Sequence, residues 1–235
     1  MSNIKILQIN VNRNPNTTEN VLQTAIELNI KILAVQEPWT IKINSNEYRS
    51  INHPSFKQVL PNYGAFRPRT LFYISREFRA NLAPNSPQDP DCTILDLIEL
   101  NTQLINVYNA IHPSIPNSIA TIQRTGILPT SLATNTILLG DFNTHHPWWD
   151  PLTPQSANSK YLIDIIEKYS LNLLNIPGEG TFYRPNMSIP SVLDLTLATQ
   201  GIVNTVQDWQ VLPDLGSDHF GVLFTILSNN SNLPN

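Results

Sequence analysis

The sequence predicts an α/β fold in which two packed β-sheets are flanked by helices. Stretches with the pattern of strands outnumber those with the pattern of helices, and several strand-like stretches follow one another directly. Consecutive strands favour two packed sheets over a simple alternation of strands and helices. With 235 residues, of which 41% are hydrophobic, the chain is long enough to bury a sizeable core in one domain.

The first third of the chain shows one helical and two strand-like patterns. Alternating apolar and polar residues predict the first strand, and an apolar stripe at helical spacing predicts the helix, with Thr17 or Thr18 as its N-cap. An almost continuous apolar run then predicts a strand covered on both faces, which Pro38 ends so that Glu37 lies at its tip. We expect a strand at 4–10, a helix at 19–28, a strand at 30–35 and an irregular segment at 40–70.

The remaining two thirds continue the strand-rich pattern. A proline-rich segment at 84–91 is expected to be a loop, and Gly126 and Pro129 are expected to end the helix that begins at residue 117 early. Apolar residues on one helical face predict a second helix. We expect helices within 117–132 and 160–169, and strands at 70–75, 93–100, 103–108, 137–141, 171–175, 192–198, 206–211 and 220–227.

The domain organisation follows from composition. Residues 1–227 are expected to form one domain, and residues 228–235, which are mostly Asn, Ser and Pro, to form a linker or disordered tail. No apolar run approaches the ~20 residues of a membrane span, so we expect no membrane partner. The start of the chain has no signal-peptide pattern, and Cys92 is the single cysteine, which excludes an internal disulfide.

The charge balance leaves a nucleic-acid partner open. A formal net charge of −4 argues against phosphate binding, which usually depends on basic patches. However, ten of the fourteen Lys and Arg residues lie at or before Arg79, so basic residues are concentrated in one part of the sequence. Several acids fall in the suspected site, where a divalent cation would offset them. Charge alone therefore decides nothing about the partner.

Polar residues of catalytic type gather where predicted strands begin or end. Such side chains are usually held on loops and strand ends above a rigid scaffold, although any one alone is more typical of a cap or a turn. If these strand ends share one edge of the sandwich, the side chains converge on one site. The candidate catalytic residues are Asn10, Glu37, Tyr108, Asp141, Asn143, Asp194, Asp218 and His219.

Acid, amide and imidazole groups at strand ends suit metal-assisted cleavage of a phosphodiester. Protein-bound Mg²⁺ is held by one or two carboxylates and keeps waters and phosphate as its remaining ligands. We expect Glu37 to be the main ligand, with Asp218 and Asn10 also in the metal site. Mg²⁺ is the expected ion, and Mn²⁺ is the alternative.

The remaining candidates suit proton transfer and phosphate binding. Because side chains alternate faces along a strand, Asp141 and Asn143 are expected to point the same way. Asp141 would then handle the proton of the attacking water, and Asn143 would donate to the phosphate. His219 would meet a phosphate oxygen as a cation, provided that Asp194 supports its far nitrogen.

The order of these motifs resembles the endonuclease–exonuclease–phosphatase superfamily. Within it, the chain is similar to the apurinic-type endonuclease domain of non-LTR (LINE-type) retrotransposons. Each motif is weak alone, but their common order with compatible spacing, from Ile4 to about Leu227, makes the resemblance specific. The motifs are Gln8-x-Asn10, Gln36-Glu37-Pro38-Trp39, Arg67-Pro68-Arg69, Asn106-x-Tyr108, Gly140-Asp141-Phe142-Asn143, His145-His146-Pro147-Trp148-Trp149-Asp150, Thr181-Phe182, Ser191-x-x-Asp194 and Ser217-Asp218-His219.

The resemblance implies a four-layer α/β sandwich of the DNase I-like type, with two mostly antiparallel sheets. It also implies an enzyme that nicks double-stranded DNA and leaves a 3′-hydroxyl. That end would prime reverse transcription by a polymerase domain further along the same polypeptide. We therefore expect nuclear localisation, inferred from the substrate, and a monomer for the isolated domain. The eight candidate residues match the active site of the family.

Further residues are candidates for contacts with DNA. Arg67 and Arg69 suit phosphate binding, with solvated surface arginines as the alternative. Trp148 is placed either to stack on DNA or to pack in the core. The segment around Tyr183 and Arg184 is expected to form a strand or hairpin that meets DNA. Thr181, Ser191 and Ser217 match polar positions that support the site.

Other interpretations remain open at this stage. His145, His146 and Asp150 suggest a metal cluster, but loop packing or contact with the DNA backbone suits adjacent residues better. A small phosphoester substrate, as for a phosphatase or sphingomyelinase-like enzyme of the same superfamily, is the alternative activity. A catalytically inactive DNA-binding relic of a mobile element is the non-enzymatic alternative.

Overall fold

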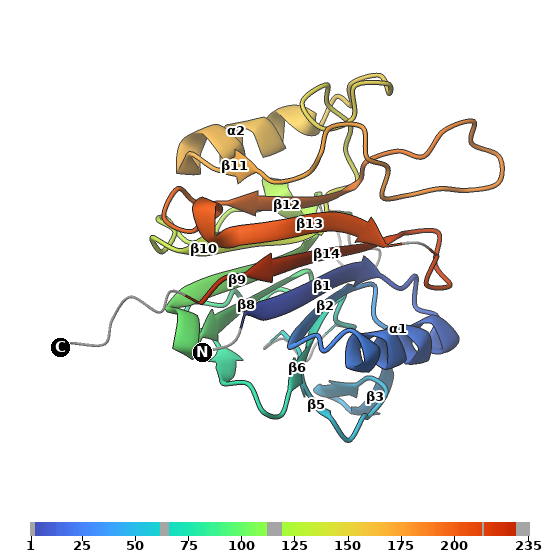
Figure 1. The fold of residues 1–235 in the computed structure, drawn as a ribbon, viewed down its shortest axis with the longest axis vertical. Coiled ribbons are helices and arrows are strands. Elements are labelled where there is room, and N and C mark those ends of the chain that lie inside the picture. The colour runs from blue at the N-terminus through green and yellow to red at the C-terminus, as the bar shows by residue number, and fades with distance from the viewer. Residues whose placement is uncertain (1–2, 62–65, 112–118, 213, 229–235) are drawn as a thin grey trace.

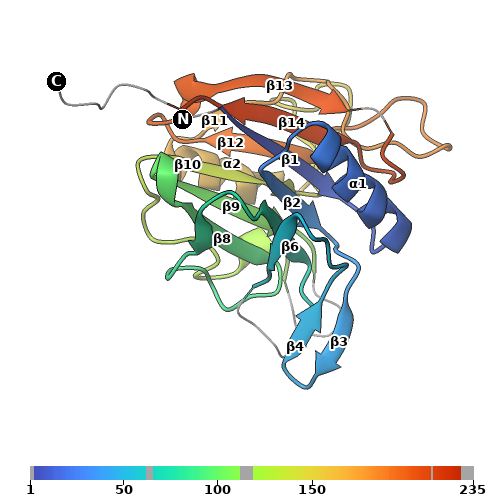
Figure 2. The same cartoon turned by 60° about the horizontal axis from the view of Figure 1, so that its bottom comes forward.

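Two six-stranded sheets pack face to face, with a helix on each outer side (Figures 1 and 2). This computed structural model describes residues 3–61, 66–111, 119–212 and 214–228. The predicted tail at 228–235 lies almost wholly outside the described residues. Among the helices that are described, none is long and apolar enough to cross a membrane.

The first sheet is built around the amino-terminal strand. Its central strands β1 and β2 are parallel, and every other pair of neighbours is antiparallel. The predicted first strand is therefore confirmed at residues Ile4–Asn10. The strand order is β13 (Val206–Leu212), β14 (Gly221–Ile226), β1 (Ile4–Asn10), β2 (Ile32–Gln36), β6 (Thr70–Ser75) and β5 (Phe56–Val59).

The second sheet repeats this plan with the middle of the chain. Its central strands β9 and β10 are parallel, and the outer pairs are antiparallel. A separate two-stranded sheet, β3 (Ile41–Asn44) with β4 (Glu47–Arg49), projects from the molecule (Figure 2). The order in the second sheet is β11 (Asn172–Leu173), β12 (Asp194–Ala198), β10 (Thr136–Asp141), β9 (Thr102–Tyr108), β8 (Cys92–Leu97) and β7 (Ala80–Leu82).

Three layers of apolar side chains hold the four layers of the fold together. Ile6 and Phe72 of the first sheet meet Leu104 of the second between the two sheets. Helix α1 (Pro15–Glu27) covers the outer face of the first sheet, and α2 (Ser159–Tyr169) covers the outer face of the second. Because the first sheet is covered on both faces, its central strand β2 is apolar up to Gln36, as the run at 30–35 indicates. The predicted four-layer α/β sandwich is confirmed.

Helix α1 begins earlier than the apolar stripe predicts. Asn14 is the N-cap, because its side chain accepts hydrogen bonds from the backbone N–H groups of residues 16 and 17, and Pro15 occupies the first turn. The prediction that Thr17 or Thr18 caps the helix is therefore wrong. Both threonines are buried inside the first helical turns.

Two further expectations are corrected. The segment 40–70 is not irregular throughout, because it contains β3, β4 and β5. Strand β3 pairs with β4, and β5 pairs with β6. These backbone hydrogen bonds stabilise strands in a segment whose many Asn residues do not indicate them in the sequence. The expected helix at 117–132, whose first two residues lie outside the described chain, is replaced by one 3₁₀ turn at Thr121–Gln123. Gly126 has a φ of +78°, which a helix does not accommodate, and the Thr121 hydroxyl bonds the carbonyl of Tyr108 instead of its own turn.

Candidate active site

The two parallel pairs at the sheet centres bring their carboxyl ends to one rim of the sandwich. Polar side chains connect the sheets near that rim: Gln36 Nε2 donates to Asn106 Oδ1 over 2.6 Å, and the hydroxyls of Thr70 and Thr93 lie 2.7 Å apart. The interior thus changes from apolar to polar toward the strand ends. These bonds fix how the ends of one sheet face the ends of the other.

Asp141 is the centre of this rim. It ends β10, in register with Tyr108 of β9 and Asp194 of β12. The preceding Gly140 has a φ of +149°, and a Cβ there would lie 1.8 Å from the carbonyl oxygen of Val107. Only glycine lets β9 approach this closely, which explains why the acid follows a glycine.

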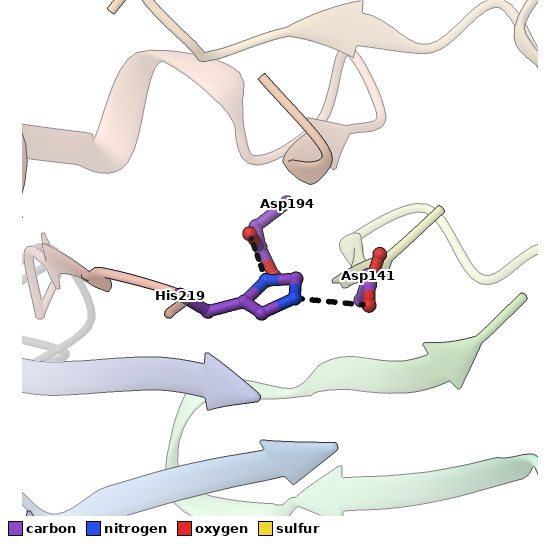
Figure 3. Close-up of side chains that lie close together, drawn as sticks. All are labelled: Asp141, Asp194 and His219. Atoms are coloured by element: carbon purple, nitrogen blue, oxygen red, sulfur yellow. Dashed lines mark hydrogen bonds and ion pairs between the residues drawn. The ribbon is translucent and has the colours of Figure 1, made fainter. Parts of the chain in front are cut away.

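His219 lies between two carboxylates. Its Nδ1 is 2.8 Å from Oδ2 of Asp194, and its Nε2 is 3.8 Å from Oδ2 of Asp141 (Figure 3). Its side chain is 7% exposed. The predicted support of His219 by Asp194 is therefore present, although the three residues lie far apart in the sequence.

This arrangement sets the charge of the imidazole. Burial lowers the pKa of His219, because it disfavours the charged ring, but the negative charges of Asp194 and Asp141 outweigh burial and raise the pKa to about 9. Burial also raises the pKa of Asp141 above its ordinary value, against the opposing effect of His219. The two carboxylates therefore favour the charged form of the imidazole.

Asn10 links the first sheet to this centre. Its Nδ2 donates to Oδ2 of Asp141 over 2.9 Å, and its Oδ1 accepts from the backbone N–H of Asn12 over 2.8 Å. The hydroxyl of Ser217 donates to the backbone carbonyl of Asn10 over 2.7 Å and accepts from the N–H of His219 over 3.2 Å. Ser217 thus connects the histidine loop to β1, and its hydroxyl is used for that connection.

Glu37 lies beside Tyr108 and Arg13 on the same rim. Its carboxylate forms an ion pair with the Arg13 guanidinium. Burial, followed by the charges of Glu37 and Asp141, raises the pKa of Tyr108, so the phenol stays protonated and hydrogen-bonds to Glu37. The sequence interpretation missed Arg13, whose one signal is its place in the loop after the first strand.

Arg69 is not available to DNA, which corrects the prediction of a phosphate contact. Its guanidinium is 4% exposed and donates two hydrogen bonds to the buried carboxylate of Asp91. It also lies over the ring of Tyr108, 4.8 Å from the centroid. Arg69 therefore supports Tyr108 from inside the protein, whereas Arg67 is exposed.

Comparison with known proteins agrees with this geometry. The profile of the endonuclease–reverse transcriptase family matches residues 102–223, just over half of the chain. The chain belongs to this family. The matched segment contains the Asp141, Asp194 and His219 cluster, while Asn10 and Glu37 precede it. Among curated proteins, none matches.

Solved structures share the fold along nearly the whole of this family member. The endonuclease domain of TRAS1, a telomere-specific non-LTR retrotransposon, is 18% identical with a TM-score of 0.74, and the match covers 97% of this chain and all of that one. AP endonuclease LMAP from Leishmania major is 12% identical, with a TM-score of 0.62 and coverages of 96% and 88%. An AP endonuclease from Archaeoglobus fulgidus is 15% identical, with a TM-score of 0.62 and coverages of 95% and 99%. At these identities the likeness establishes the fold.

The side chains of this family member fit a hard divalent cation. Ligand atoms of Asp141, Asp194 and His219 lie within 4.8 Å of one another, but a protonated imidazole has no free lone pair for a metal. Oxygen donors are available nearby, since the buried Oδ1 of Asp218 has no hydrogen-bond partner among the described residues. Glu37 and Asp218 are not members of this compact cluster. The predicted metal ligands therefore remain Glu37, Asp218 and Asn10.

Asn143 does not share a strand face with Asp141, which corrects that expectation. Strand β10 ends at Asp141, and Asn143 has a left-handed backbone with a φ of 49°. Its N–H donates to Oδ1 of Asp141 over 3.0 Å, and its side chain is exposed. The amide therefore reaches solvent at the rim through a turn.

The residues predicted to contact DNA divide into buried and exposed groups. Thr181 is buried, and its hydroxyl accepts from the N–H groups of Leu193 and Asp194, so it shapes the loop that carries Asp194. Ser191 is also buried. These two side chains support the site from within. Exposed and available to a partner are Arg67, Trp148, Tyr183 and Arg184.

Arg184 has a second role beside Asp218. Its guanidinium forms an ion pair with Oδ2 of Asp218 over 2.9 Å and lies over the ring of Phe182, 4.9 Å from the centroid. The guanidinium thus holds one oxygen of Asp218 and leaves Oδ1 for another ligand. Arg184 thus connects the outer surface to Asp218 of the candidate metal site.

Proposed function

We propose that this chain is a Mg²⁺-dependent DNA endonuclease, which nicks one strand of a duplex and leaves a 3′-hydroxyl that primes reverse transcription. The observation that carries the proposal is the buried imidazole of His219, held between Asp194 and Asp141 at a polar rim. A fixed cation stabilises the charge that develops on a phosphate as it is attacked. The family, whose name joins an endonuclease to a reverse transcriptase, supports the same reading.

Each protein group at the rim has a role in this reaction. His219 donates from Nε2 to a phosphoryl oxygen, and Asp194 holds the ring by Nδ1, as an acid orients a catalytic histidine. Asp141 accepts the proton of the attacking water, and Asn10 orients its carboxylate. Asn143 donates to the phosphate from its turn.

A bound Mg²⁺ would supply positive charge at the phosphoryl and leaving oxygens. Glu37, Asp218 and Asn10 would hold it, and Mn²⁺ is the alternative ion. In the protein as it stands, Arg13 is paired with Oε1 of Glu37. Tyr108 keeps its proton and hydrogen-bonds to Glu37.

The biological setting is a proposal of the same kind. The fold likeness to the TRAS1 endonuclease domain, together with the family, supports a domain of a non-LTR retrotransposon. We propose that residues 1–227 form the endonuclease domain, that a reverse transcriptase domain belongs to the same full-length polypeptide, and that the protein acts on nuclear DNA. The isolated domain is proposed to be monomeric.

Nicking of supercoiled plasmid tests the activity. We expect conversion to the open circle with Mg²⁺, none with excess EDTA, and recovery when Mg²⁺ or Mn²⁺ is restored. Extension of the nicked strand by a DNA polymerase checks for the 3′-hydroxyl. Turnover of a small phosphoester without plasmid nicking would show that the substrate is a small phosphoester and not DNA. Salt-sensitive DNA binding without cleavage would indicate an inactive relic.

A further inference from the structure

A second imidazole–carboxylate pair lies outside the cluster around His219. Nδ1 of His145 is 2.7 Å from Oδ2 of Asp150. The carboxylate is 3% exposed and the imidazole 27% exposed. Because an ionised carboxylate only accepts hydrogen bonds, Nδ1 carries a proton and the ring is held in one orientation. Nε2 takes no part in this bond.

The imidazole of His145 lines a surface hollow of about 410 Å³. Neutral side chains make up the rest of the lining that the structure describes, among them Leu152, Phe182 and Asn186. No carboxylate faces the hollow from these residues, although the chain carries a net charge of −4. The hollow is therefore a place where an anion meets an imidazole without a competing acid, because Asp150 lies behind the ring.

The hollow adjoins the active site through one residue. The ring of Phe182 packs against the ring of His219, with 4.8 Å between centroids, and also lines the hollow. The backbone of Phe182 pairs with both Ser191 and His219. Phe182 thus places the hollow beside the site around His219.

We propose that His145 binds a phosphodiester of the substrate DNA other than the one that is cut, and so positions the strand. The inference rests on the proposed function, since it takes the substrate to be duplex DNA. Nε2 faces the phosphate as a hydrogen-bond donor, while Nδ1 stays bonded to the buried Asp150. Such charge-assisted bonds to phosphate fix the register of a protein on DNA without reading its sequence.

Two substitutions separate this role from a purely structural one. In His145→Asn, the amide nitrogen takes the place of Nδ1, so the bond to Asp150 is kept and the outer donor is lost. In His145→Gln, the amide nitrogen takes the place of Nε2, so the outer donor is kept and the bond to Asp150 is lost. If His145 only holds the loop through Asp150, His145→Gln should weaken DNA binding more than His145→Asn does. If His145 binds phosphate, His145→Asn should weaken DNA binding more.

Fluorescence anisotropy with a labelled duplex, without divalent metal and over a range of salt, measures the difference. We expect His145→Asn to bind about 10-fold more weakly and to reduce the steepness of the salt dependence by about one phosphate contact. His145→Gln is expected to lose less affinity but to melt at a lower temperature. The control is His146→Asn. In the wild type the His146 ring packs against Trp148 and Trp149, so this change should leave the salt dependence of DNA binding unchanged.

Wild-type affinity in His145→Asn, or weaker binding by His145→Gln than by His145→Asn, would overturn the inference. Both results are read from binding without metal, so they are independent of cleavage. Wild-type protein that binds the duplex but fails to nick plasmid with Mg²⁺ contradicts the proposed endonuclease alone. If the wild-type protein nicks plasmid and both His145 variants bind the duplex equally well, only the proposed role of His145 is contradicted.

Discussion

The molecule contains two imidazole–carboxylate pairs whose surroundings differ. His219 with Asp194 is buried and has a second carboxylate, Asp141, 3.8 Å from its other nitrogen. His145 with Asp150 is partly exposed, and the histidine lines a hollow whose other described lining residues include no acid. The same pair of side chains therefore holds a fixed cation in one place and a solvent-facing donor in the other. Burial and the second acid decide which role is possible.

The largest expected effect is at the buried pair. His219→Ala and Asp141→Ala should each reduce plasmid nicking by at least about 10³-fold, because each removes a group that acts on the reacting phosphate or its attacking water. Both variants should keep the wild-type circular dichroism spectrum. Retained nicking in either one refutes the role given to that residue and removes the contrast with His145.

Asp194→Asn tests whether the carboxylate sets the charge of His219. The pKa of His219 should fall from about 9 toward or below its ordinary 6.5, because burial lowers the pKa and the main opposing charge is gone. Nicking should fall by about 10²-fold or more, as when the acid of a catalytic triad is replaced. Titration of the imidazole by NMR measures the pKa. If His219 still titrates near 9 in this variant, then Asp141 rather than Asp194 is the main cause of its raised pKa.

Asp150→Asn is the matched change at the exposed pair. Oδ2 of Asp150 also accepts from the backbone N–H of Val192, so the variant should lose about 1–3 kcal/mol of unfolding free energy. The folded fraction should nick with nearly the wild-type rate at saturating DNA. Urea unfolding and nicking assays distinguish the two effects. An Asp150→Asn protein that is stable but inactive contradicts the division between the pairs.

The smallest expected effect is on the pH dependence of stability. The folded-state pKa of His219 is raised above its unfolded value, so its contribution to stability is complete below about pH 6.5 and is lost as pH rises through about 9. The difference in unfolding free energy between wild type and His219→Gln should therefore shrink across this window. Urea unfolding at several pH values measures it. A difference that grows with pH shows that the buried imidazole is neutral.

Local patterns were enough to predict most strands of the two sheets and to place polar residues at their ends. Apolar runs and alternation located the central strands, and Gly140-Asp141 marked the end of β10 where the acid lies. They were weaker where pairing with a distant segment stabilises the structure. Strand β5 forms because β6 lies beside it, and the helix expected from residue 117 is replaced where Thr121 bonds Tyr108.

The candidate site shows the same division. Asp194 and His219 could be named from the sequence because several acids, amides and an imidazole occur together at the ends of predicted strands. Asn143 was assigned the wrong direction, because alternation applies only while the strand continues. Arg69 was expected at the surface, yet it is buried on Asp91. Burial depends on which segments pack around a residue, and no local pattern contains that information.

The sequence by itself determined which residues are apolar at which period, and so the presence of two sheets, and it placed acids, amides and an imidazole at the ends of their strands. Only the tertiary structure decided that Asn10, Asp141, Asp194 and His219 meet at one rim, that Arg13 faces Glu37, and that two histidines with similar partners lie in unlike surroundings. The physical reason is that pairing between strands and burial between layers are contacts across long sequence separations. Those contacts set the distances and desolvation on which the charges of the site depend.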